Sequence, residues 1–233
     1  LIRQEEILFC GPILGLGIGM SILGGHPETT FHTTFVYLSY FCMRIIIADK
    51  DIIRKFRLVI AFFFSVILGC LIGGVQLMPF LDFVLESSTL AAGGRSMGGD
   101  NLLFSKECIA NFATSITFVY PNFFGNPIDY TYFWPFAGYQ NYIEQSVYFG
   151  LIPFSLSIGA LFSSDKPRTL IIIVFLCLFC FGVAWRLPGF EIFNHLPLFS
   201  MVLNKRLKLP FAFLAAIMAG FGYDTFVYDL YSD

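Results

Sequence analysis

The chain has 233 residues, of which 57% are hydrophobic and only 13% are charged, and its formal net charge is −2. Soluble domains carry about 25% charged residues, so this chain has too few charges to cover a water-facing surface. The composition therefore argues against a soluble domain, and the sequence contains neither a basic domain nor a nucleic-acid-binding motif. Because it starts at Leu1 without a basic segment and cleavage site, we expect a fragment of a longer protein.

Long apolar runs predict an all-α, polytopic membrane helix bundle with about six transmembrane helices, since roughly 20 apolar residues cross a bilayer core. The runs are continuous rather than alternating, which favours helices over the strands of a barrel. We expect one transmembrane domain over residues 1–233. Its predicted spans lie near residues 7–24, 30–47, 58–80, 146–162, 169–185 and 209–226.

Charges between the spans predict their orientation. Five basic residues lie from Arg44 to Arg57, which indicates a cytoplasmic loop because such loops carry an excess of Lys and Arg. The segment 81–145 then lies on the outer side. It is rich in Tyr, Trp and Phe, residues that favour the membrane–water interface, and Pro and Gly interrupt it. We expect short interfacial helices and turns on the outer leaflet, covering a cavity.

Three cations, Lys205, Arg206 and Lys208, precede the last predicted span on the side where basic residues are disfavoured. Charge-assisted hydrogen bonds would suit them to a lipid phosphate or diphosphate. Snorkelling toward anionic headgroups explains the same cluster, and so does a different topology. The three readings stay open on the sequence alone.

A second candidate lies in the turn between the first two spans. Histidine side chains can carry protons under physiological conditions, so His26 is a candidate proton carrier or phosphate contact, while Glu28 near the next helix start interacts favourably with the helix dipole. An interfacial histidine that caps the turn is the alternative.

Further polar candidates follow the third span. Asp82 and Glu86 are four residues apart, on one helix face, where they could bind a metal or act as base and stabiliser in sugar transfer. They are equally explained as solvated residues at a helix end. Gln76 is expected to face the bundle, since a buried amide needs a partner in lipid. Arg95 lies in a Gly-rich loop that either cradles phosphate or is simply mobile.

The cysteines predict no metal site. Cys177 and Cys180 form a C-x-x-C pair inside a predicted span, without the second pair that zinc requires. No cofactor is predicted, although a divalent cation remains an option at the carboxylates.

Several short motifs, each weak alone, occur in an order that resembles the bacterial YfhO membrane proteins. The resemblance covers nearly the whole chain. Its motifs are Gly24-Gly25-His26-Pro27-Glu28, Gly73-Gly74-Val75-Gln76 with Pro79, Ser87-Ser88, Tyr120-Pro121-Asn122-Phe123-Phe124-Gly125, Tyr148-Phe149-Gly150, His195-Leu196-Pro197-Leu198-Phe199-Ser200, and Leu214 to Gly222. This chain departs from the family pattern at Glu28, where glutamine is usual, and in the spacing of Lys205, Arg206 and Lys208.

The resemblance implies a GT-C type glycosyltransferase in the bacterial cytoplasmic membrane. Such an enzyme takes a sugar from a polyprenyl-phosphate carrier and adds it to a cell-envelope polymer such as lipoteichoic acid. Its principal carboxylate would lie upstream of Leu1, leaving Asp82 and Glu86 as secondary candidates. The carrier phosphate would meet Lys205, Arg206 and Lys208, with His26, Glu28, Gln76 and Arg95 bordering the substrate site.

Two other classes of protein remain. A transporter or flippase of lipid-linked precursors would also need outer cations, but its spans usually carry charges or breaks that are scarce here. A non-catalytic membrane assembly subunit is the second alternative.

Overall fold

A computed structural model describes residues 4–48, 51–86, 106–134, 141–163 and 167–232. Every helix or strand assigned within these residues is an α- or 3₁₀-helix, as the apolar runs predict. The chain divides into two compact units, Leu1–Gly94 (unit 1) and Arg95–Asp233 (unit 2).

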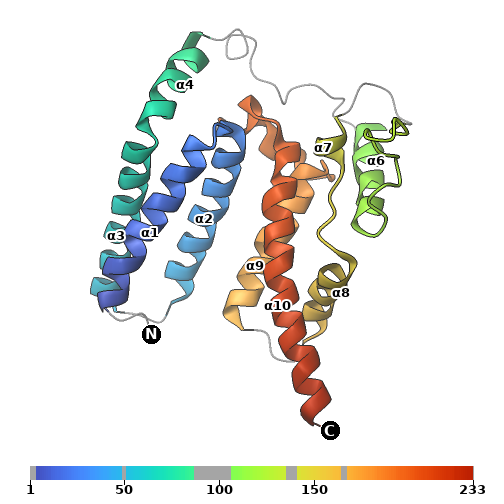
Figure 1. Cartoon of the computed structure of the whole chain (residues 1–233). Helices are drawn as coiled ribbons and strands as arrows, with labels where there is room; N and C mark the ends of the chain where they lie inside the picture. Colours follow the sequence, from blue (N-terminus) through green and yellow to red (C-terminus); the bar gives the residue numbers. More distant parts are fainter. Residues whose placement is uncertain (1–3, 49–50, 87–105, 135–140, 164–166, 233) are drawn as a thin grey trace. The chain divides into compact units, whose positions relative to one another are not determined.

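Unit 1 consists of four helices, α1 (Gln4–Leu23), α2 (Pro27–Ile47), α3 (Ile52–Ile72) and α4 (Gly74–Glu86). The reversal between α1 and α2 forms as the sequence predicts. Gly25 has a φ of 71°, which favours glycine, and Pro27 is the first residue of α2. A second reversal after α2 makes α1 and α3 run in the same direction (Figure 1).

The predicted span 58–80 is wrong in its bounds. The structure places two helices there, because α3 ends at Ile72 and α4 starts at Gly74. Two adjacent glycines weaken the helix at this joint, and Pro79 removes a backbone donor shortly after it. The 21 residues of α3 measure about 31 Å, which matches a bilayer core of roughly 30 Å. Helix α3 alone would therefore cross a core of that thickness, and α4 would not be needed for the crossing.

Glycines let α1 and α3 pack with their backbones close together. A Cβ added at Gly69 would lie 2.6 Å from Ile18 Cγ2 and 2.9 Å from the Gly15 carbonyl oxygen. A Cβ at Gly19 would lie 2.7 Å from Ile72 Cγ2. Ser65 continues this stripe of small residues and is fully buried. Such small-residue pairing is typical of helices that associate inside membranes.

Gly69→Val is therefore expected to separate α1 from α3 and to cost about 2 kcal/mol of unfolding free energy, since overpacking displaces backbone here. Titration of the full-length protein with a denaturing detergent, followed by circular dichroism, measures the loss. Gly17→Val is the matched control, because a Cβ at Gly17 meets no atom of the described residues within 4 Å. Equal stability of the two variants would contradict the packing argument.

Unit 2 is built around α10, which packs along α8 and α9. Its core combines Leu170, Leu176 and Val183 of α9 with Leu214 and Met218 of α10, all buried. The described elements of this unit are α6 (Lys106–Ala113), η1 (Thr114–Phe118), α7 (Tyr142–Gln145), α8 (Leu151–Gly159), η2 (Ala160–Phe162), α9 (Arg168–Ala184), η3 (Glu191–His195), η4 (Phe199–Met201), η5 (Asn204–Leu207) and α10 (Lys208–Ser232).

Two of the three predicted spans in unit 2 match helices closely, since 169–185 corresponds to α9 and 209–226 falls within α10. The span 146–162 is wrong at its start, because helix begins only at Leu151. Gly150 has a φ of 104°, a conformation that no α-helix contains. Nine residues in α8 and three in η2 measure about 20 Å, too short for a bilayer core of roughly 30 Å.

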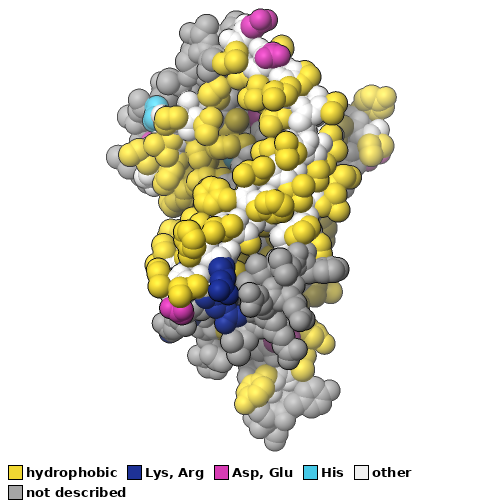
Figure 2. All heavy atoms as spheres, turned by 90° about the vertical axis from the view of Figure 1, so that its left-hand side faces the viewer, with side chains coloured by type: hydrophobic (Ala, Val, Ile, Leu, Met, Phe, Trp, Pro, Cys, Tyr) yellow, Lys and Arg dark blue, Asp and Glu magenta, His cyan; other side chains and the backbone are white. Residues whose placement is uncertain are grey.

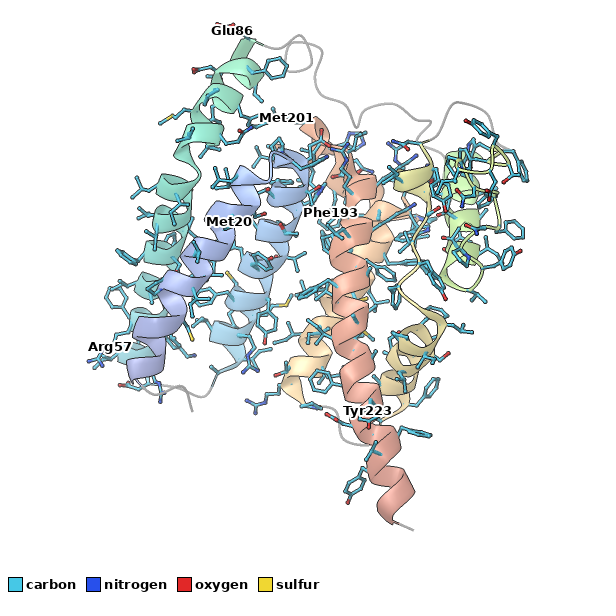
Figure 3. The ribbon with its side chains drawn as sticks, in the orientation of Figure 1. Met20, Arg57, Glu86, Phe193, Met201 and Tyr223 are labelled. Carbon is cyan, nitrogen blue, oxygen red and sulfur yellow. The ribbon has the colours of Figure 1, made fainter. Side chains whose placement is uncertain are left out.

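Two helical segments of the described chain, Ile52–Ile72 and Asn204–Tyr228, are long and apolar enough to cross a membrane. Only 11% of the most apolar stretch in the first, and 33% in the second, is buried. A core helix of a soluble protein would be mostly buried, so these two differ from that class. Figure 2 shows hydrophobic side chains over much of one face of unit 1. The lysine and arginine side chains visible on this face form a single patch. Helices α3 and α4 follow one another, and Figure 3 labels Arg57 near the start of α3 and Glu86 at the end of α4.

Candidate functional site

The three predicted phosphate-binding cations lie where η5 leads into α10, and they differ in burial. Lys205 and Arg206 are half-exposed, whereas Lys208 is only 6% exposed. A hydrogen bond from the Arg206 amide to the Leu203 carbonyl oxygen (3.0 Å) helps to form this turn. The structure therefore keeps two cations near the surface and directs the third into unit 2.

Lys208 joins segments that are far apart in the sequence. Its ammonium nitrogen lies 3.4 Å from Thr114 Oγ1, 3.3 Å from the Gln145 carbonyl oxygen and 3.5 Å from Gln145 Oε1. Thr114 is fully buried and Gln145 is 1% exposed. A buried charge is costly unless polar groups surround it, so these acceptors account for the position of the lysine. We call Lys208, Thr114, Gln145, Trp185 and Asn111 the Lys208 site.

An aromatic cluster forms the other wall of the site. The Lys208 nitrogen lies 4.9 Å from the centre of the Trp185 ring, within the range of a cation–π interaction. Trp185 in turn contacts Phe211 (5.4 Å between ring centroids) and Phe118 (5.6 Å). Trp185 follows directly after α9 and is fully buried. The cluster excludes water from one side of the ammonium group.

Threonine side chains determine the shape of the segment that faces Lys208. Thr114 donates to the Asn111 carbonyl oxygen at 2.6 Å, and Thr117 donates to the Thr114 carbonyl oxygen at 2.7 Å. These bonds coincide with the change from α6 to the 3₁₀-helix η1, since threonine hydroxyls compete with the backbone for helix carbonyls. Thr117 also accepts the Val147 amide (3.1 Å), which links η1 to the segment after α7.

A buried amide pair holds the turn that precedes Lys208. Asn204 donates from Nδ2 to Asn194 Oδ1 at 2.7 Å and to the Phe199 carbonyl oxygen at 3.0 Å. Both asparagines are almost fully buried, so these bonds form in a low-dielectric setting where they are strong. These hydrogen bonds connect η5 to η3 and hold in place Asn204, the residue that directly precedes the cations.

Two buried donors of the Lys208 site have no hydrogen-bond partner among the described residues. These are Asn111 Nδ2, on a side chain 3% exposed, and Trp185 Nε1, on a side chain that is fully buried. Asn111 lies three residues before Thr114 and therefore on the same helix face. A buried polar group without a partner is rare and marks a place where a ligand or an ion can bind. Together with an ammonium group, two such donors suit an anionic oxygen.

The candidates His26 and Glu28 belong to unit 1. His26 is exposed at the start of α2, where its Nδ1 lies 3.0 Å from Thr29 Oγ1. Glu28 is half-exposed in the first turn of the same helix. His26 occupies the N-cap position of α2, but its side chain makes no capping hydrogen bond to the helix backbone, so both interpretations of this residue stay predictions.

The remaining unit 1 candidates lie on α4. Asp82 and Glu86 are both exposed, and Gln76 is exposed as well. Gln76 falls in α4, none of whose side chains is buried, rather than inside a continuous span, and the expectation that it faces a bundle stays a prediction. Arg95 and the Gly-rich loop lie outside the described residues.

No group of three or more His, Cys, Asp or Glu residues that could hold a metal ion occurs in the described part of the chain. Cys177 and Cys180 are free thiols buried in α9. The Cys177 sulfur lies 4.0 Å from the Phe211 carbonyl oxygen, a contact made to the backbone of α10.

The sequence prediction identified Lys208 but missed Asn111, Thr114, Gln145 and Trp185. The available signal was a polar residue at every third position, Asn111, Thr114 and Thr117, inside an otherwise apolar helical stretch. That period places the three on one face of a helix.

No protein-family model matches this chain, and neither a curated protein nor a solved structure matches it.

Proposed function

We propose that this chain is part of a multi-pass bacterial cytoplasmic membrane protein, with helices at the six apolar runs, that resembles the YfhO family. Its activity would be that of a GT-C type glycosyltransferase: transfer of a sugar from a polyprenyl-phosphate carrier to an envelope polymer. Large exposed apolar side chains on α3 support the membrane location, among them Phe56, Phe63 and Leu71. Apolar surface of this extent is unusual for a protein surrounded by water.

The observation that carries the proposal is the Lys208 site. The buried cation Lys208 begins α10, a helix long enough to cross a membrane, and Asn111 and Trp185 are buried donors without an acceptor among the described residues. A carrier whose phosphate is anionic and whose tail is apolar has the matching chemistry. Lys205 and Arg206, half-exposed beside the site, add positive charge that attracts such a headgroup.

In the transfer reaction, an acceptor hydroxyl oxygen attacks the anomeric carbon of the sugar. The bond between that carbon and the phosphate oxygen breaks, and the polyprenyl phosphate leaves with the electron pair. A carboxylate takes the hydroxyl proton. Lys208, Asn111 and Trp185 would stabilise the negative charge on the leaving phosphate, because fixed donors in a site without water act strongly on developing charge.

The test uses the full-length protein in liposomes that contain polyprenyl-phosphate-linked radiolabelled hexose or N-acetylhexosamine. Label is followed into an envelope-polymer acceptor. Trp185→Phe keeps an aromatic ring under Lys208 but removes the Nε1 donor. We expect about tenfold weaker carrier binding and a similar loss of transfer, the effect of one hydrogen bond to a charged group.

Trp134→Phe is the matched control, since it makes the same substitution in unit 2 outside the Lys208 site. Equal transfer by the two variants would remove Trp185 from the site. If no donor supports transfer but carrier crosses the bilayer faster than in protein-free liposomes, the protein is a flippase and the glycosyltransferase proposal is wrong. Constant co-purification of one partner without transfer or carrier movement would indicate an assembly subunit instead.

A further inference from the structure

The α6–η1 segment has its polarity reversed relative to a helix of a soluble protein. Asn111, Thr114 and Thr117 point inward and are 3%, 0% and 1% exposed. On the other side, Ile109, Phe112 and Ile116 are 55%, 54% and 42% exposed. We call these three residues the apolar face of α6–η1.

In water this arrangement is unfavourable for both faces of the segment, because the polar side chains are buried and the apolar side chains are exposed. A surface helix of a soluble protein turns its apolar stripe to the core and its polar residues to solvent. Here Thr114 accepts a hydrogen bond from Lys208 and Thr117 accepts one from the Val147 amide, while three large apolar side chains face outward. Only an apolar environment makes the outward face favourable, because aliphatic and aromatic side chains are more stable away from water than exposed to it.

Ring contacts locate this segment within unit 2. Phe112 lies 6.5 Å from Phe181, one turn before the end of α9. Phe118 stacks on Phe211, in the first turn of α10, with ring centroids 5.4 Å apart. The α6–η1 segment therefore lies beside the first turn of α10, one of the two helices long enough to cross a membrane. Figure 3 labels Met201, which lies in η4 before that helix, and Tyr223, which lies within α10.

The loop Asn126–Thr131, which follows α6–η1 in the chain, is shaped by hydrogen bonds between its own residues. The Thr131 amide donates to the Asn126 carbonyl oxygen (3.1 Å), and the Ile128 amide donates to Asn126 Oδ1 (2.9 Å). Gly125 has a φ of 80°, and a Cβ there would overlap the Thr131 carbonyl oxygen. Tyr130 holds a φ of 55°, which is uncommon for a residue with a side chain.

This loop exposes two large side chains almost completely. Ile128 is 82% exposed and Tyr130 is 96% exposed. Loops in water rarely fix such side chains outward. Tyrosine is enriched where membranes meet water, since its ring is apolar and its hydroxyl is wet.

We infer that α6–η1 and the Asn126–Thr131 loop form one membrane-docking surface, whose partner is the phospholipid layer at the end of the bilayer where α10 begins. The apolar face of α6–η1 contacts acyl chains, and Ile128 and Tyr130 anchor the loop at headgroup depth. The sequence predicts short interfacial helices somewhere within residues 81–145, and the inference names the side chains that would contact the lipid. The inference concerns where the segment lies, and it does not depend on the proposed sugar transfer.

Photo-crosslinking of the full-length protein in phospholipid liposomes tests the surface. Benzoylphenylalanine replaces Phe112 or Tyr130, with Ile116 as a second position on α6–η1 in case one variant does not fold. The same residue at Asn122, an exposed polar position between the two elements, is the control. Adducts are identified by mass spectrometry. We expect phospholipid adducts at Phe112 and Tyr130 in at least fivefold excess over Asn122.

Adducts from Phe112 and Ile116 to peptides of residues 1–94 would show that unit 1 covers the apolar face, and the inference would be wrong. Lipid adducts no more frequent than at Asn122 would also overturn it. Lipid adducts at Phe112 but not at Tyr130 would support the helix as a lipid contact and remove the loop from the surface.

Discussion

Lys208→Met should weaken carrier-phosphate binding by about 100-fold. Methionine has a similar length and is apolar, so the substitution removes the charge and three polar contacts, to Thr114 Oγ1 and to both oxygens of Gln145, while leaving much of the volume filled. Truncating one partner of a buried, hydrogen-bonded charge costs about 2–5 kcal/mol, and about 2.7 kcal/mol corresponds to 100-fold in affinity. Titration of polyprenyl phosphate into the full-length protein in nanodiscs measures the change.

Lys205→Met is the matched control for this prediction. Lys205 carries the same charge three residues earlier but is half-exposed, and exposed charges contribute about 1 kcal/mol or less. We expect a loss of affinity of tenfold or less. Wild-type affinity in Lys208→Met, with normal thermal unfolding, would show that the buried lysine serves packing alone.

Gly222→Ala should disrupt the packing of α10 against α8. A Cβ at this position would overlap the Leu156 carbonyl oxygen and lie 3.1 Å from the Ala160 amide nitrogen, so both obstacles are backbone atoms. Backbone cannot rotate away as a side chain can, and the two helices must move apart. We expect a loss of at least about 3 kcal/mol in unfolding free energy, at the upper end of overpacking effects.

Gly220→Ala provides a control two residues away on the same helix, because a Cβ there meets no atom within 4 Å in the described parts of the chain. Alanine also favours helix more than glycine does, so this variant should be as stable as the wild type or slightly more stable. Detergent-induced unfolding of both variants measures the difference. Similar midpoints would mean that α8 and α10 are further apart than the structure places them.

Long apolar runs were sufficient to predict helices, rather than strands, in the part of the chain that the structure describes, and strong local signals located several helix ends. Pro27 begins α2 and Gly25 turns the chain before it, since each residue imposes its own backbone conformation. Continuous apolar runs, by contrast, say nothing about where a helix breaks inside them. The joint at Gly73 and the late start of α8 after Gly150 therefore escaped the hydropathy pattern.

The candidate site was predicted only in part, for a different reason. Lys208 stands out in sequence because a charge near an apolar run is unusual. Its partners Thr114 and Gln145 lie 94 and 63 residues earlier, and no local pattern relates residues at such separations. Trp185 and Asn111 look ordinary in an aromatic-rich chain, and only their burial distinguishes them.

The reversed polarity of α6–η1 also bears on the heat capacity of unfolding. Apolar side chains that enter water on unfolding raise the heat capacity, which curves the stability of soluble domains with temperature. Ile109, Phe112 and Ile116 already face outward in the folded unit. If lipid surrounds them in both states, their solvation does not change when helices separate. These three side chains would then add little to the heat capacity of unfolding, and stability in the bilayer would curve less with temperature than their area in water would imply.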